Sequence, residues 1–133
     1  MEKKPALAPE LVNEFVANAH GDFARVKELL DEEPALLNAA WDWGGGDWET
    51  ALGAASHMGR ADIAGYLLER GARLDIFAAA MLGKLDVVQA IARTQPSALT
   101  APGPHGISLL THAEKGGEAA AAVVEFLTQY GAE

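Results

Sequence analysis

The chain has 133 residues and a formal net charge of −9, from 10 Lys and Arg against 19 Asp and Glu. Half of the residues are hydrophobic but only 7% are aromatic, so the core has to be built from Ala, Leu and Val, as in closely packed helices. The acidic balance disfavours nucleic acid and anionic membranes as partners, and the absence of cysteine excludes disulfides and thiolate metal sites.

Residues 1–8 are expected to form an N-terminal tail, and residues 9–133 a single domain. The tail has no apolar core of the kind that secretory signals carry. No later stretch approaches the about 20 consecutive apolar residues of a membrane span. These features predict a cytoplasmic protein without a membrane partner.

Apolar residues at helical spacing, separated by glycines and prolines, predict eight helices. Pro9 suits the first turn of the first helix, and Gly131-Ala132 is expected to end the last one. The predicted helices cover residues 9–19, 22–32, 49–58, 60–70, 75–82, 84–94, 108–115 and 119–130.

The helices occur in pairs that share one pattern around an interhelical glycine. After Gly21, Gly59 and Gly83, an apolar residue falls five, eight and nine places later, which gives each second helix the same apolar stripe. Gly117 begins a fourth copy that needs about two extra residues to restore the register. Four copies in register indicate a repeat protein, because a lone helical hairpin cannot bury its apolar face.

The first helix of each pair begins at a capping residue. Thr50 and Ser108 stand nine residues before Gly59 and Gly117, where their side chains can cap the helix, and Asp75 can serve the third pair. Thr50-Ala-Leu-Gly-Ala-Ala-Ser-His-Met-Gly59 resembles the ankyrin motif Thr-Pro-Leu-His-x-Ala-Ala-x-x-Gly, as does Ser108-Leu-Leu-Thr-His-Ala-Glu-Lys-Gly-Gly117. Both copies keep the cap, the Leu and the final Gly, and both lack the family's Pro and His.

This resemblance to ankyrin repeats implies an all-α fold, an ankyrin-repeat solenoid of about four helix-turn-helix repeats. The whole chain is similar to the short free-standing ankyrin proteins of bacteria. This similarity implies that the protein binds a partner through its finger loops and the adjacent first helices. The expected repeats are approximately residues 9–46, 47–72, 73–104 and 105–133.

Two long loops depart from a regular array. They span residues 31–48 and 95–106, and Leu36 and Leu99 are expected to tuck beneath them. Between the second and third pairs, only residues 72–75 remain, which is too short for a projecting hairpin. The two long loops should therefore flank a gap on one edge of the stack.

The first long loop carries three tryptophans. Trp41, Trp43 and Trp48 surround the triplet Gly44–Gly46, which we interpret as a flexible turn rather than a phosphate loop, because acidic residues adjoin it and no Lys-Ser/Thr follows. Tryptophan on a loop is a preferred interface anchor. The alternative, that the tryptophans pack over the helix ends, stays open.

Residues that precede the interhelical glycines map to the inner concave surface of an ankyrin stack. Two adjacent copies would place His57, Met58 and Met81 near one another under the tryptophan loop. This arrangement predicts an apolar patch with one titratable group, although Met81 is also a suitable core residue.

The four histidines do not follow a ligand spacing known from metal sites. No His-x3-His or His-Glu-x-x-His pattern places two of them on one helical face, and no Gly-x-Ser-x-Gly elbow is present. We therefore expect no metal, no cofactor and no catalytic residue.

The function that follows is a non-enzymatic, monomeric protein–protein interaction module. Aromatic and apolar anchors with a rim of carboxylates would favour a partner with Lys or Arg opposite them. The expected partner-binding residues are Trp43, Asp47, Trp48, Glu49, His57, Met58, Met81, His105 and Ile107.

Two other functions stay open. One is a small-molecule-binding protein or enzyme whose pocket is enclosed by the two long loops. It would use His57 or His105 with Asp42, Asp47 or Glu49 as acid and base. The other is a subunit of a larger assembly with an interface on the last helix.

Overall fold

The computed structural model describes residues 4–130, which form eight α-helices, one two-stranded sheet and four short 3₁₀ turns. The eight predicted helices are confirmed, each with its ends within two residues of the expected ones, whereas the expected stop at Gly131-Ala132 lies outside the described residues. The helices are α1 (Pro9–Asn18), α2 (Phe23–Glu32), α3 (Ala51–His57), α4 (Ala61–Glu69), α5 (Ile76–Met81), α6 (Leu85–Thr94), α7 (Leu109–Lys115) and α8 (Ala121–Gln129).

Polar side chains begin the first helix of three pairs at the predicted positions. Thr50, Asp75 and Ser108 each accept a hydrogen bond from the backbone N–H three residues later. Each bond satisfies a backbone donor that has no partner inside the helix. The predicted capping roles of these three residues are therefore confirmed, including Asp75 where the sequence motif is weakest.

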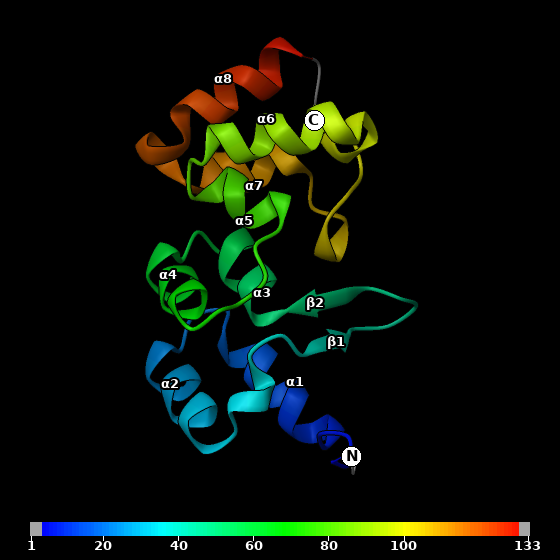
Figure 1. Ribbon diagram of the computed structural model, residues 1–133, viewed down its shortest axis with the longest axis vertical. Coiled ribbons are helices and arrows are strands. Elements are labelled where there is room, and N and C mark those ends of the chain that lie inside the picture. The colour runs from blue at the N-terminus through cyan, green and yellow to red at the C-terminus, as the bar shows by residue number, and fades with distance from the viewer. Residues whose placement is uncertain (1–3, 131–133) are drawn as a thin grey trace.

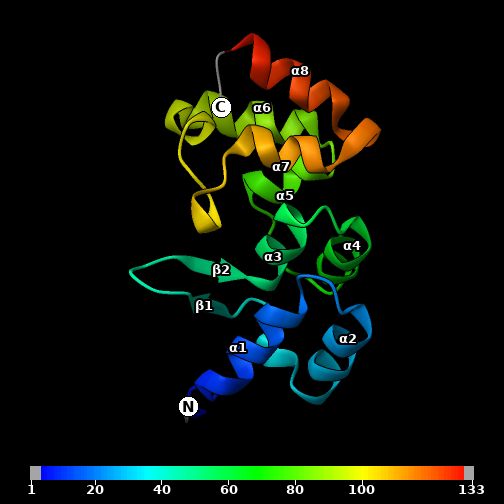
Figure 2. The same cartoon turned by 180° about the vertical axis from the view of Figure 1, so that it is seen from behind.

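The molecule is elongated, and the helix pairs follow one another along its long axis from the N-terminal to the C-terminal end (Figure 1). Each of α1, α3, α5 and α7 packs on the helix that follows it, and these four helices also contact one another in succession. Helices α2 and α4 lie on one side of this row, and α6 and α8 contact each other at its C-terminal end (Figures 1 and 2). The chain is thus mostly helical and layered along one axis.

The core consists of two hydrophobic clusters, one for each half of the molecule. Leu67 of α4, eight places after Gly59, belongs to the predicted apolar stripe and is fully buried. Leu36 of the first long loop is also fully buried, as expected. Leu68, the next residue of that stripe, and Leu99 of the second long loop are only half-buried, so the expectation of burial holds only in part for them. Their side chains lie at the edges of the two clusters rather than inside them.

The last two helix pairs approach each other closely at the turn after α5 and the turn after α7. Gly83 has φ 76°, and a Cβ built on it would collide with the backbone oxygen of Ala119. Glycine adopts this left-handed conformation at little cost and leaves room for the neighbouring backbone. The contact fixes how tightly the last two pairs pack.

A β-hairpin within the first long loop is the main element that the all-α prediction did not include. Strands β1 (Ala40–Asp42) and β2 (Trp48–Thr50) pair antiparallel, with Trp41 opposite Glu49. The glycine turn at its tip is held rather than free, because the Asp42 carboxylate accepts the N–H groups of Gly44 and Gly46. The hairpin and the segment before α7 extend from the same side of the molecule (Figures 1 and 2).

The turns between these elements include η1 (Pro34–Leu36), η2 (Pro96–Leu99), η3 (Pro104–Gly106) and η4 (Gly117–Ala120). Within residues 4–130, none of the helices combines the length and the hydropathy that a bilayer span requires.

Candidate functional site

Strand β2 turns alternate side chains toward solvent and toward the interior. Trp48 is 60% exposed, whereas the next residue, Glu49, is only 1% exposed. This alternation follows from the two-residue period of a strand. Glu49 thereby carries a carboxylate into the body of the protein at the base of the hairpin, where it requires polar partners.

Three histidines surround the Glu49 carboxylate. Nε2 of His57 lies 2.9 Å from Oε2, Nε2 of His105 lies 3.3 Å from the same oxygen, and Nε2 of His20 lies 3.2 Å from Oε1. His20 follows α1, His57 ends α3 and His105 belongs to η3, so four separate elements meet at this point. We call these four residues the His–Glu cluster.

The hairpin also supplies the outer contacts of the His–Glu cluster. The indole Nε1 of Trp43 donates a hydrogen bond of 2.9 Å to Oε1 of Glu49. The carboxylate of Asp47 accepts the backbone N–H of His105 at 2.7 Å, and its second oxygen lies 2.9 Å from Nδ1 of the same residue. Asp47 therefore ties the hairpin to the second long loop.

His105 has a left-handed backbone with φ 61° and ψ 18°. Among the non-glycine residues that the structure describes, it is the only one with positive φ. Such a conformation is unfavourable for a residue with a Cβ and persists only where the surroundings impose it. Here it turns the imidazole toward Glu49 and Asp47.

The backbone of α1 orients His20. Its Nδ1 lies 3.1 Å from the carbonyl oxygen of Val16 and 3.0 Å from that of Ala17. Because a carbonyl oxygen can only accept, Nδ1 carries the proton, and in the neutral ring Nε2 presents a lone pair. The ring of His20 also meets that of His57 edge-on, with centroids 4.9 Å apart.

Charge interactions in the cluster shift two pKa values. Burial alone would raise the pKa of Glu49, but the contacts with His20 and His57 outweigh it, and the net pKa is lowered far below its usual value. The contact with Glu49 raises the pKa of His20 above 6.5, against the smaller opposing effect of burial. Glu49 is therefore ionised and attracts positive charge.

His112, the remaining histidine, lies outside the cluster. It is fully buried in α7, and its Nδ1 lies 2.8 Å from the carbonyl oxygen of Ser108. Desolvation by burial lowers its pKa. Its ring packs against Phe77, with centroids 4.7 Å apart, so it acts as a neutral core residue.

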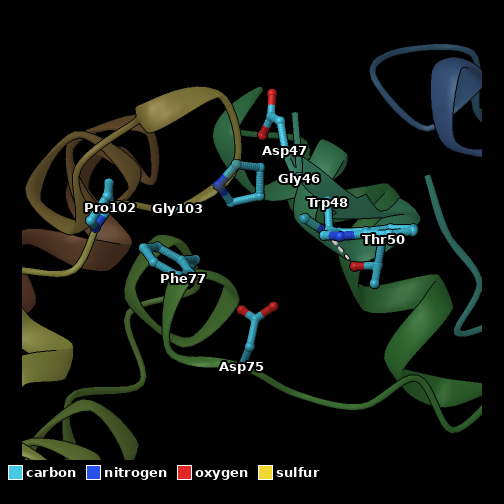
Figure 3. A pocket seen from close by; sticks show the side chains of 10 residues that line it. Gly46, Asp47, Trp48, Thr50, Asp75, Phe77, Pro102 and Gly103 are labelled. Carbon is cyan, nitrogen blue, oxygen red and sulfur yellow. Dashed lines mark hydrogen bonds between the residues drawn. The ribbon is translucent and has the colours of Figure 1, made fainter. Parts of the chain in front are cut away.

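A groove of about 370 Å³ runs between the hairpin and the second long loop. Figure 3 shows Phe77 and Pro102 on one side of it and Trp48 with Thr50 on the other. The groove adjoins the His–Glu cluster through Asp47. It is lined by Gly46, Asp47, Trp48, Thr50, Gly53, Asp75, Phe77, Pro102, Gly103 and Pro104.

The structure unites five of the nine expected binding residues, because Trp43, Asp47, Glu49, His57 and His105 all belong to the cluster or contact it. Their arrangement differs from the expected surface, because Glu49 is buried and cannot form part of an exposed carboxylate rim.

The other expected binding residues are dispersed. Met81 is 1% exposed and belongs to the core, so it cannot anchor a partner. Met58 is exposed, Ile107 is half-buried, and Trp48 stands on the groove. The proposed patch of His57, Met58 and Met81 is thus not a continuous surface.

The sequence interpretation missed His20. His20 and His57 each directly precede an interhelical glycine, Gly21 or Gly59, so they stand at matching positions in two consecutive helix pairs. This matching position is the signal in the sequence that could have placed His20 beside His57.

No protein-family model, curated protein or solved structure matches this chain. The chemistry of the site is therefore argued from its own geometry.

Proposed function

We propose that the chain is an ankyrin-type repeat module that binds a polypeptide partner through the groove beside Trp48. The fold part of this proposal is supported by the succession of contacts among α1, α3, α5 and α7. Such contacts between equivalent helices of adjacent pairs are what a helical solenoid requires.

Local geometry also recurs from pair to pair. Gly59, Gly83 and Gly117 have φ values of 68°, 76° and 63° at equivalent interhelical positions. The capping residues Thr50 and Ser108 stand nine positions before two of these glycines. The same turn after the same capped helix supports a repeated structural unit.

The binding function is supported mainly by one observation, the exposure of Trp48 on a paired strand that lines the groove. Its indole is 60% exposed, although the β2 backbone on which it stands is paired with β1. A large apolar side chain held by regular structure loses little entropy when a partner covers it. Phe77 and Pro104 supply further apolar surface in the same groove.

Charge defines the class of partner. The carboxylates of Asp47 and Asp75 line the groove, and the whole chain has a net charge of −9. We therefore expect a partner segment that inserts an apolar residue beside Trp48 and presents Lys or Arg to the carboxylates. Complementary charge of this kind accelerates association and adds specificity.

The second candidate, a small-molecule site or enzyme, is favoured by one observation. His57 and His105 do contact carboxylates, as that hypothesis requires. The groove itself is open to solvent, however, and no histidine is among the residues found to line it within positions 4–130. A substrate in the groove would thus meet only Asp47 of the proposed acid–base pairs, which favours polypeptide recognition.

A selection from a random peptide library, followed by affinity measurements on the selected peptides, tests this proposal. Trp48→Ala should weaken binding about 30-fold, the equivalent of about 2 kcal/mol for a buried aromatic anchor. Tyr130→Ala is the matched control, because Tyr130 is a similarly exposed aromatic residue, at 64%, on the last helical pair.

The selected peptides should be rich in Lys or Arg, and their affinity should fall as salt is added. Peptides that bind both variants with wild-type affinity, or that are predominantly acidic, would refute the groove as the binding surface.

A further inference from the structure

We infer that His20, Glu49, His57 and His105 form a binding site for one divalent transition-metal ion, with Zn²⁺ as the reference ion. Each residue offers one nitrogen or oxygen atom, and the four atoms lie within 4.8 Å of one another. This inference is independent of the groove and of its proposed peptide.

Unpaired polar atoms are the first observation that points to a ligand. Oε2 of Glu49 and Nε2 of His57 are buried and 2.9 Å apart, yet within residues 4–130 neither has a hydrogen-bond partner. The pair is a charge contact at short distance that does not count as a hydrogen bond of good geometry. Buried polar atoms that lack partners cost free energy unless a water or an ion completes them.

The outer contacts of two histidines give the second observation. Backbone carbonyls of α1 hold the Nδ1 proton of His20, and Asp47 holds that of His105. Metal-bound histidines are oriented in the same way, with the second ring nitrogen donating to a carbonyl or carboxylate. When these two rings are neutral, each presents an Nε2 lone pair toward Glu49.

Lone pairs gathered around a carboxylate repel one another unless a positive charge lies between them. Protons on all three Nε2 atoms would also remove the repulsion, but His20 and His105, whose Nδ1 atoms already hold a proton, would then be two imidazolium groups beside one carboxylate. A single divalent cation satisfies all four atoms at once. The arrangement therefore favours a metal ion over three separate protons.

The donor set and its dimensions select the class of ion. Three imidazole nitrogens and one carboxylate suit Zn²⁺ and its first-row neighbours, whereas Ca²⁺ and Mg²⁺ prefer oxygen ligands. In a tetrahedral zinc site with bonds of about 2.1 Å, the ligand atoms are about 3.4 Å apart. The widest separation here, at most 4.8 Å, would have to close by roughly 1.4 Å.

Backbone strain at His105 is the third observation. The left-handed conformation brings Nε2 of His105 to 3.3 Å from Oε2 of Glu49. Strained backbone conformations cluster at functional sites, where the strain holds a side chain in the position that its role requires.

The ion would join the base of the hairpin, the end of α1, the end of α3 and the second long loop. Four protein ligands fill a tetrahedral coordination shell, which is the arrangement of a structural metal site. Because Asp47 belongs to both the groove and the outer contacts of the cluster, the ion would also fix one wall of the groove.

The test is calorimetric titration of the chelator-stripped full chain with ZnCl₂. Wild type should bind one Zn²⁺ per chain, and His57→Gln and His105→Gln should each weaken binding at least tenfold. His112→Gln is the matched control, because it replaces the one histidine outside the cluster. Circular dichroism of each variant verifies that it is folded.

A second measurement uses wild type alone and so depends on no variant. Titration with CoCl₂ should give the intense visible absorption of four-coordinate Co²⁺, and MgCl₂ in excess should not displace it. Absence of saturable Zn²⁺ binding, a Co²⁺ spectrum of six-coordinate type, or equal losses in all three variants would each overturn the inference.

Discussion

Nε2 of His57 and Oε2 of Glu49 are 2.9 Å apart, but across the described part of the chain neither atom makes a hydrogen bond. Two residues that come from the end of α3 and from β2 thus form a close charge contact in which neither atom has a hydrogen-bond partner. In a well-packed interior such atoms normally find partners. This relationship links the helical layering of the protein to its candidate chemistry.

The core packing of the second helix pair gives the first prediction. Leu67 is fully buried in α4, so Leu67→Ala should lower the free energy of unfolding by about 2–5 kcal/mol. Leu74→Ala is the control, because Leu74 is 40% exposed and its truncation should cost much less. Urea denaturation of both variants measures the difference, and equal losses would mean that the pairs pack differently.

Close approach of two helix pairs gives the second prediction. Gly83→Ala places a Cβ against the backbone oxygen of Ala119 and forces a left-handed alanine, so it should destabilise the protein by roughly 2 kcal/mol or more. Gly65→Ala, in α4 with open space around it, should instead stabilise by about 0.5–1 kcal/mol. Thermal unfolding compares them, and a shift of the same sign in both would contradict the packing described.

The backbone of His105 gives the third prediction. His105→Ala and His105→Gly both remove the imidazole, so the difference between their free energies of unfolding reports the cost of the backbone conformation. At φ 61°, the glycine variant should be more stable than the alanine variant by about 1 kcal/mol. Denaturation in the presence of a chelator measures this, and two equally stable variants would show that the left-handed conformation is not imposed.

Burial of His112 gives the fourth prediction, which concerns pH. Burial lowers the pKa of His112 below 6.5, so the folded state keeps the ring neutral while the unfolded chain takes up a proton. The stability that this group contributes is therefore complete above pH 6.5 and declines as the pH falls below it. The decline should reach up to about 1.4 kcal/mol per pH unit.

Comparison of wild type with His112→Leu isolates this effect. The charged or titratable neighbours His57, Asp75 and Glu49 are the same in both chains and cancel in the difference. In chelator, the stability of wild type relative to the variant should fall between pH 7.5 and 5.5. A difference that is constant over this range would mean that His112 is not held neutral.

Much of the helical framework was predictable because its signals are local. The apolar stripe after each interhelical glycine and the caps Thr50, Asp75 and Ser108 depend on residues within one helix pair. The sequence did not reveal how deeply Glu49 is buried. That depends on the register of the hairpin, which sets which side of β2 faces the interior.

The His–Glu cluster was not predictable from ligand spacing. A search for two histidines on one helix fails here, since His20, His57 and His105 come from the end of α1, the end of α3 and a loop. Only the alignment of adjacent pairs brings His20 beside His57. The position of His105 depends on the Asp47 contact across 58 residues of chain, for which no local pattern exists.

The most direct measurement for the central claim is an anomalous difference map from crystals of the chain grown with Zn²⁺, recorded at the zinc absorption edge. We predict one strong peak within about 2.0–2.2 Å of Nε2 of His20, His57 and His105 and of a Glu49 carboxylate oxygen. A map with no peak among these four residues, or with zinc only at exposed surface carboxylates, would contradict the account.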